Sequence, residues 1–337
     1  MLLSHFIKTS IAALAALYPE EEARSMVMYY CTEVFGFPVY QHITEPSTEV
    51  PEDLLEMALD DMRRLAASEP LQYVLGYTEF CGRRFAVDER ALIPRAETEV
   101  LCQKAQEMVR AVEATASDPV RGSAAHPSQP GGWAPPSNDA EGGTPLGGST
   151  STASALRVLD LCTGSGCIAW TLALDLPGAQ VVATDLSQEA LDLADSQFRT
   201  ASGRPSRLPK GALRPRFVKA DLLDTEATVA AAGEGFELLT ANPPYVMVAE
   251  KADMRQNVLG WEPHMAIFAP EEDPLVFHKA IADVAMRVLV PGGCGIVEIN
   301  SEIPDQTAAV FTAAGFEDIR IIQDYFDRPR FISFRRP

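Results

Sequence analysis

The sequence predicts a doubly wound α/β domain with a mostly parallel sheet, preceded by a small helical bundle and a β-hairpin. Two observations predict the α/β domain: after Ala155, short apolar runs alternate regularly with helical segments, and a glycine-bearing turn follows the first run. The bundle is predicted because apolar residues in the first 75 positions recur at helical spacing. At 337 residues, with 47% hydrophobic content, the chain is long enough for two packed cores.

The N-terminal region, residues 1–76, is expected to form a compact helical domain. Its apolar positions at helical spacing are Ile7, Ile11, Leu14 and Leu17, then Leu54, Leu55, Ala58, Met62 and Leu65. The run 11–17 is similar to the core of a signal peptide, but no clear cleavage site follows it, so we interpret it as part of the first helix.

Residues 77–113 are expected to connect this bundle to the sheet. Shorter apolar spacing around Gly82 predicts a β-hairpin over 77–93, which Pro94 ends. A helix is predicted over 97–112, with Glu99 in its first turn, where the helix dipole favours acidic side chains.

Residues 114–155 differ in composition from the rest of the chain. Gly, Pro, Ser and Thr dominate this stretch, and Trp133 stands alone in it. Such a segment cannot bury enough apolar surface to offset its ordering entropy, so a disordered insertion is predicted.

The remaining region, 156–337, predicts a Rossmann-like sheet of seven strands. The expected strands are 157–161, 180–184, 216–219, 236–241, 295–299, 318–322 and 330–334, and the expected helices begin at 166 or span 187–199, 274–289 and 304–314. The last two strands are close enough in sequence to pair antiparallel.

Polar and glycine residues at the expected strand ends predict a nucleotide site. Gly164 and Gly166 follow the first strand and open a helix, so backbone N–H groups can approach a ligand there. Asp185 ends the next strand, where it could accept hydrogen bonds from ribose hydroxyls, and Asp221 follows the third strand, near an expected adenine. The spacing is not that of a dinucleotide fingerprint and instead indicates S-adenosylmethionine.

The tetrapeptide Asn242-Pro243-Pro244-Tyr245 follows the fourth strand. The two prolines fix an extended corner, and Asn242 is held out of the helical region. The Asn242 side-chain oxygen and the Pro243 carbonyl are two acceptors that could bind one NH2 group and orient its nitrogen lone pair. This arrangement suits methylation of an amide or an exocyclic amine, and Tyr245 is expected to pack against the substrate side chain.

Taken together, these motifs make the chain resemble the release-factor glutamine methyltransferases (the PrmC/HemK family), class I enzymes that use S-adenosylmethionine. Besides the glycine turn and the NPPY corner, the segments that carry the resemblance are 69–76, 80–82, 92–99, 257–264 and 291–293. The chain departs from the family pattern at Cys162, where a glycine is common, at Ala96, where a proline is common, and at 327–330, where a glycine-containing turn is common.

The resemblance implies methylation of the side-chain nitrogen (N5) of the glutamine in the Gly-Gly-Gln loop of class-1 peptide-chain release factors, whose body the helical domain would recognise. The implied cofactor residues are Cys162, Thr163, Gly164, Ser165, Gly166, Asp185, Asp221, Leu222 and Asn242. The implied catalytic residues are Asn242, Pro243 and Tyr245, and the implied substrate-binding residues are these three and Pro244. Arg95 and Glu97 are expected either to shape the cleft at the domain junction or to form an ion pair that stabilises a hinge.

Composition narrows the class of partner. A formal net charge of -19 matches phosphate backbones poorly, so no stable nucleic-acid complex is expected. The basic stretch 204–216 is interpreted as a solvated loop. The six cysteines form no CxxC pair and the five histidines show no metal-ligand spacing, so we expect a reduced, metal-free, cytoplasmic monomer that does not enter membranes.

Three alternatives stay open at this point. A ribosomal-protein glutamine methyltransferase shares the segment 92–99, and a DNA amino-methyltransferase shares the NPPY chemistry. A non-catalytic binding protein would be expected to lose one of the two motifs, and both are intact.

Overall fold

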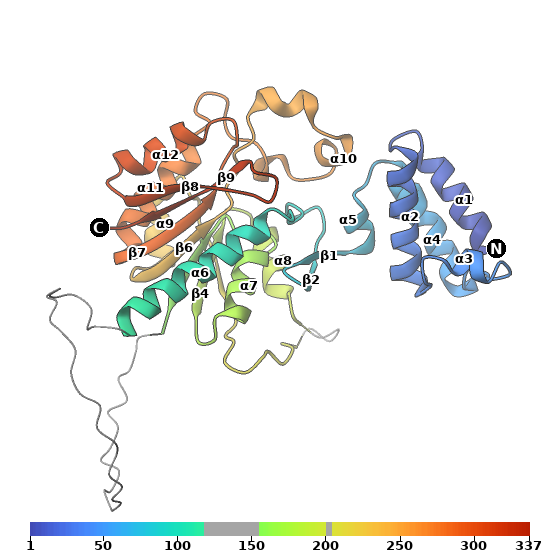
Figure 1. Ribbon diagram of the computed structural model, residues 1–337, viewed down its shortest axis with the longest axis horizontal. Coiled ribbons are helices and arrows are strands. Elements are labelled where there is room, and N and C mark those ends of the chain that lie inside the picture. The colour runs from blue at the N-terminus through green and yellow to red at the C-terminus, as the bar shows by residue number, and fades with distance from the viewer. Residues whose placement is uncertain (118–154, 200–203) are drawn as a thin grey trace, which may run out of the picture.

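The computed structural model describes residues 1–117, 155–199 and 204–337. A helical unit lies at one end of an α/β unit, and the segment between them carries a hairpin (Figure 1). The helical unit contains α1 (Leu3–Leu14), α2 (Glu20–Phe35), α3 (Gln41–Thr44), α4 (Glu52–Ala66) and α5 (Leu71–Leu75).

The helical unit has a core of its own. Phe6, Ile11 and Leu14 of α1 are buried against α2 and α4, as their spacing predicts. Leu17 is 44% exposed, contrary to expectation, because α1 ends at Leu14 and the helical spacing no longer applies beyond it.

A hairpin and a long helix lead from the helical unit to the sheet. Strands β1 (Tyr77–Phe80) and β2 (Arg83–Ala86) pair antiparallel, as predicted. Tyr77 and Arg84 on this hairpin both bond the carboxylate of Glu33 in α2, which ties the hairpin to the helical unit. Helix α6 (Thr98–Ser117) extends five residues beyond its expected end at 112.

The α/β unit is built on the predicted seven-stranded sheet. Its strands are β3 (Arg157–Leu161), β4 (Gln180–Asp185), β5 (Arg216–Lys219), β6 (Phe236–Ala241), β7 (Leu289–Glu298), β8 (Glu317–Gln323) and β9 (Pro329–Arg335). Their spatial order is β5-β4-β3-β6-β7-β9-β8. The first five in this order are parallel, and β9 pairs antiparallel with both β7 and β8, as predicted for the last two strands. Strand β7 begins six residues before its expected start at 295.

Helices cover both faces of this sheet. Successive strand residues point to opposite faces, so Val158 belongs to the core under α6 and α7 (Cys167–Asp175), whereas Leu159 belongs to the core under the other layer. That other layer consists of α9 (Thr225–Ala232), α11 (Val276–Val288) and α12 (Pro304–Ala313). Helix α8 (Gln188–Ser196) packs beside β4 and β5.

Several short elements were not predicted. Helix α9 is short and rich in alanine, which leaves little contrast between an apolar and a polar face for the sequence to show. Between β6 and α11 lie the 3₁₀ turns η1 (Val248–Asp253) and η2 (His264–Ala266), and between these lies α10 (Gln256–Leu259). These pieces are too short to carry a periodic signal.

The prediction of a disordered insertion is not tested by the structure. The insertion expected at 114–155 falls largely on residues 118–154, which lie outside the described residues, and so does Trp133. In the part of the chain that the structure describes, no helix combines the length and apolar character needed to span a bilayer.

Candidate active site

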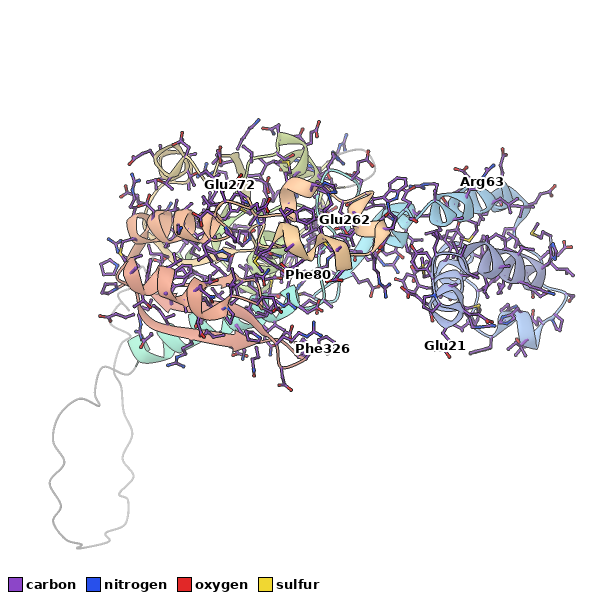
Figure 2. All side chains as sticks on the ribbon, turned by 90° about the horizontal axis from the view of Figure 1, so that it is seen from above. Glu21, Arg63, Phe80, Glu262, Glu272 and Phe326 are labelled. Atoms are coloured by element: carbon purple, nitrogen blue, oxygen red, sulfur yellow. The ribbon has the colours of Figure 1, made fainter. Side chains whose placement is uncertain are left out.

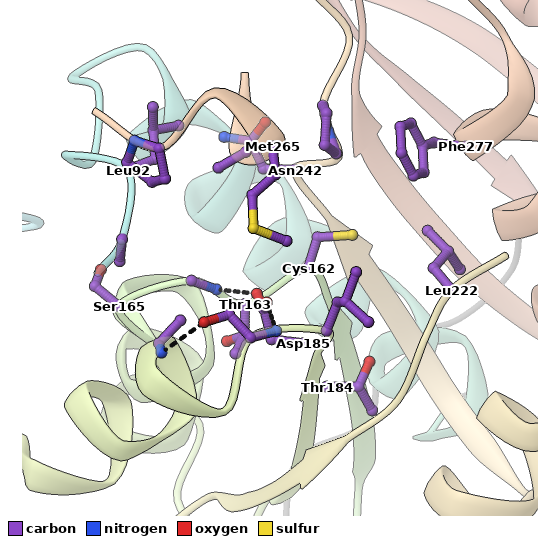
Figure 3. Close-up of a pocket in the computed structure, with 18 of the residues that line it drawn as sticks. Leu92, Cys162, Thr163, Ser165, Thr184, Asp185, Leu222, Asn242, Met265 and Phe277 are labelled. Carbon is purple, nitrogen blue, oxygen red and sulfur yellow. Dashed lines mark hydrogen bonds between the residues drawn. The ribbon is translucent and has the colours of Figure 1, made fainter. Parts of the chain in front are cut away.

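A cavity of about 310 Å³ opens at the carboxyl ends of the parallel strands (Figure 3). This is the edge at which ligands bind in open α/β sheets. Of the residues predicted for cofactor or substrate, those lining the cavity are Cys162, Thr163, Gly164, Ser165, Asp185, Asp221, Leu222, Asn242 and Pro244. Gly166, Pro243 and Tyr245 are not among the lining residues.

The turn after β3 is held by the acid at the end of the neighbouring strand. Asp185 Oδ2 accepts the backbone N–H of Gly164 at 2.8 Å, and Asp185 Oδ1 accepts that of Ser187 at 2.9 Å. Each oxygen keeps a free lone pair for a further donor. Burial raises the pKa of Asp185. Gly164 has a left-handed φ of 53°, and so does Cys162, at 56°, where a glycine would carry less backbone strain.

Gly166 serves packing at this turn. It is the N-cap of α7 with φ at 80°, and a Cβ placed on it would lie 2.8 Å from Ala194 Cβ in α8 and 3.2 Å from Trp170 Cδ1. The sequence assigned this glycine to the ligand. In the structure it is not among the cavity-lining residues, and its lack of a side chain lets α7 and α8 approach each other.

Replacing Gly166 by alanine should therefore destabilise the protein more than replacing Gly164. Both residues have positive φ, so both variants carry a backbone penalty of about 1–2 kcal/mol. Only Gly166→Ala adds overpacking, worth a further ~1–3 kcal/mol, since nothing lies within 4 Å of a Cβ at Gly164. Urea unfolding of the two variants measures the difference, and equal losses would contradict this packing role.

Asp160 lies beneath the site, not on its wall. It is fully buried in β3 and accepts hydrogen bonds from Thr163 Oγ1 at 2.6 Å and Thr240 Oγ1 at 2.7 Å. Burial raises the pKa of Asp160 to about 7, although the two hydroxyl donors oppose the shift. The carboxylate thereby links the glycine turn after β3 to the strand that leads to the NPPY corner.

The raised pKa of Asp160 predicts a pH-dependent stability. Because the folded-state pKa of about 7 exceeds the unfolded value of about 3.9, the folded protein binds the proton more tightly. This contribution is complete below about pH 4 and is lost as pH rises to about 7, with a slope of at most about 1.4 kcal/mol per pH unit. The free energy of unfolding of the wild type, minus that of Asp160→Asn, should fall across this window in urea titrations. A difference that stays constant with pH would show that Asp160 titrates normally.

The NPPY corner rests on a buried carboxylate that the sequence analysis missed. Tyr245 Oη donates to Glu298 Oε1 at 2.7 Å, and Thr98 Oγ1 donates to Glu298 Oε2 at 2.8 Å. Glu298 is 1% exposed, and burial raises its pKa. Asn242 Nδ2 lies 3.5 Å from Thr98 Oγ1, and Asn300 Nδ2 donates to the Tyr245 carbonyl at 3.1 Å.

An ion pair links the two segments that supply Pro94 and Pro263 to the cavity wall, and Arg95 has a different partner from the expected one. Arg95 Nη2 bonds Glu262 Oε1 at 2.7 Å, and Glu262 Oε2 accepts the backbone N–H of Ile93 at 3.0 Å. Glu262 lies on the side of the α/β unit that faces the helical unit (Figure 2). The partner of Arg95 is thus Glu262 instead of Glu97, since the segment 257–264 folds back onto segment 92–99.

The structure also adds lining residues that the sequence did not single out. Apolar side chains complete the wall. Leu92, Met265 and Phe268 come from connections, and Phe277 comes from α11. Figure 3 shows Leu92, Met265 and Phe277 around the cavity. Met265 and Phe268 follow the segment 257–264, so only their closeness to a recognised motif could have indicated them.

The sheet order, the glycine turn and the site at the carboxyl edge define a class I S-adenosylmethionine-dependent methyltransferase fold.

No protein-family model matches the chain. A release factor glutamine methyltransferase of Bacteroides thetaiotaomicron is 30% identical over 330 residues, covering 96% of each chain. The enzyme of the same name in Flavobacterium psychrophilum is 28% identical and covers 99% of each chain. That of Chlorobaculum tepidum is 35% identical over 80% of this chain and 76% of its own. The chain belongs to the release factor glutamine methyltransferase family.

Proposed function

We propose that this protein transfers the methyl group of S-adenosylmethionine to the side-chain amide nitrogen of the glutamine in the Gly-Gly-Gln loop of class-1 release factors. The observation that carries the proposal is the position of Asn242, on the wall of the same cavity as the glycine turn. The names of the relatives, which cover nearly the whole chain, support a release factor as the substrate.

In this proposal S-adenosylmethionine occupies the cavity along the strand ends. Asp185 accepts hydrogen bonds from the ribose hydroxyls with the lone pairs that its backbone donors leave free. Asp221 and Leu222 lie beside the adenine, and the turn 162–165 contacts the methionine end through its backbone. The sulfonium methyl then points toward Asn242.

The acceptor amide is a weak nucleophile because its nitrogen lone pair is delocalised into the carbonyl. Asn242 Oδ1 and the Pro243 carbonyl would each accept one of its N–H groups at about 2.9 Å. These bonds favour a pyramidal nitrogen and stabilise the positive charge that develops during transfer. Holding nucleophile and methyl group in line contributes roughly 7–11 kcal/mol. The extra proton leaves to water after transfer, and Tyr245 packs beside the acceptor side chain.

The helical unit is proposed to recognise the body of the release factor. It lies beyond the hairpin, to the side of the α/β unit where Glu262 is found (Figures 1 and 2). Arg255, in the connection between β6 and α11, reaches Glu22 of α2 at 2.5 Å, so the helical unit contacts a loop close to the site. A protein substrate could therefore contact both units at once.

Replacing Asn242 by alanine should abolish methyl transfer while S-adenosylmethionine still binds. The substitution removes one of the two oxygens that hold the acceptor nitrogen, and the cofactor contacts along β3 and β4 are untouched. Transfer is measured with labelled cofactor and binding by calorimetry, and the binding constant serves as the control for folding. Methylation at the wild-type rate in the variant would refute the role of Asn242.

The substrate assignment is tested by offering one labelled cofactor to three acceptors: a class-1 release factor, ribosomal proteins and DNA. Label should enter the release factor, and mass spectrometry should place the methyl group on the glutamine of its Gly-Gly-Gln loop. Label found only in a ribosomal protein or in DNA would replace this assignment with one of the two alternative activities.

A further inference from the structure

Four side chains from distant parts of the chain form one hydrogen-bonded series behind the NPPY corner. Asn242 Nδ2 lies 3.5 Å from Thr98 Oγ1, Thr98 Oγ1 donates to Glu298 Oε2 at 2.8 Å, and Tyr245 Oη donates to Glu298 Oε1 at 2.7 Å. Thr98 and Glu298 are each 1% exposed. The series comes from the start of α6, the end of β7 and the loop after β6.

The number of protons in this series fixes the direction of each bond. With Glu298 ionised, its carboxylate can only accept, so both Thr98 and Tyr245 must donate to it. A threonine hydroxyl has a single proton, and Thr98 gives it to Glu298. Its remaining capacity is as an acceptor, so the Asn242 group that faces it must be the NH2 group. The Asn242 oxygen is then directed away from Thr98.

We propose that Thr98 and Glu298 are positioning residues that hold the Asn242 carboxamide with its oxygen toward the acceptor nitrogen. This inference rests on the proposed function and deepens it. With the amide reversed, Asn242 would present two N–H donors to a substrate NH2 group, and neither could accept its protons. Fixing the orientation before the substrate binds removes this unproductive state.

Glu298 is itself fixed from its other side. Tyr245 occupies its second oxygen, and the positive charge of Arg330 on β9 favours the ionised form of Glu298, which lowers the pKa of Glu298 against the effect of burial. Arg330 Nε is in turn held by Asp324 at 3.2 Å. The negative charge of Glu97, the residue before Thr98, raises the pKa of Glu298. A buried carboxylate with this set of partners remains a rigid acceptor for Thr98.

The test compares Thr98→Val, which removes the hydroxyl at nearly constant shape, with Thr98→Ser, which keeps it. Thr98→Val should lower kcat roughly 10²-fold because the acceptor is no longer held in geometry, while Thr98→Ser retains most activity. The KM for release factor and the Kd for S-adenosylmethionine should change by less than about threefold, because the lost interaction acts in the transition state and not in the binding of either substrate. Thr307→Val, at a buried threonine of α12 outside the cavity, is the matched control and should keep kcat.

Glu298→Gln provides a second test at the same volume. The new amide can donate to Thr98, which frees the threonine proton to bond the Asn242 oxygen and reverse its amide. We expect kcat to fall in this variant as well, with cofactor binding and melting temperature retained. Wild-type kcat in both Thr98→Val and Glu298→Gln would overturn the proposal, and so would losses confined to KM or cofactor affinity.

An independent measurement separates this proposal from the proposed function. In protein labelled with ¹⁵N at asparagine, the side-chain N–H signals of Asn242 are identified by their absence in Asn242→Ala. One of these protons should be protected from solvent exchange in the wild type and in Thr98→Ser, and should lose protection in Thr98→Val. Equal protection in all three proteins would refute the positioning role whether or not the enzyme methylates a release factor.

Discussion

The geometry of the NPPY corner depends on the hydrogen bonds of one buried carboxylate, that of Glu298. It lies at the carboxyl end of β7 and accepts hydrogen bonds from Thr98, the first residue of α6, and from Tyr245 in the NPPY segment. A buried charge is tolerated only when donors surround it. Removing either partner would leave a buried carboxylate oxygen of Glu298 without a hydrogen-bond donor, which destabilises the protein. The start of α6, the end of β7 and the NPPY corner are therefore fixed relative to one another.

A second buried carboxylate, that of Asp160, links the glycine turn to the strand that leads to the NPPY corner. Strands β3 and β6 are neighbours in the sheet, with Asp160 opposite Thr240. Asp160 bonds both Thr240 and Thr163 of the glycine turn, so the turn and the strand that ends at Asn242 share one acceptor. The parallel topology brings the two motifs to one edge, and these side chains then set their separation.

The sequence predicted what depends on backbone pattern. The strands, the hairpin and the residues at strand ends follow from apolar runs, glycines and prolines, which act locally. The pairing of Arg95 with Glu262, the packing of Gly166 against Ala194 and the burial of Glu298 join residues far apart in the chain. Such contacts exist only once the sheet has formed, so no local pattern could indicate them. Tyr245 shows this most clearly: its place in a motif suggested packing against the substrate, and no local pattern indicated that its hydroxyl bonds Glu298.

We propose that one rigid corner presents two oxygen acceptors to a neutral carboxamide and directs it at the methyl donor. A crystal structure of the protein with S-adenosylhomocysteine and a Gly-Gly-Gln peptide tests this directly. The glutamine nitrogen should lie about 2.9 Å from both Asn242 Oδ1 and the Pro243 carbonyl, on the side of the cavity that faces the sulfur atom. A peptide bound elsewhere, or a corner turned to solvent far from the sulfur, would contradict it.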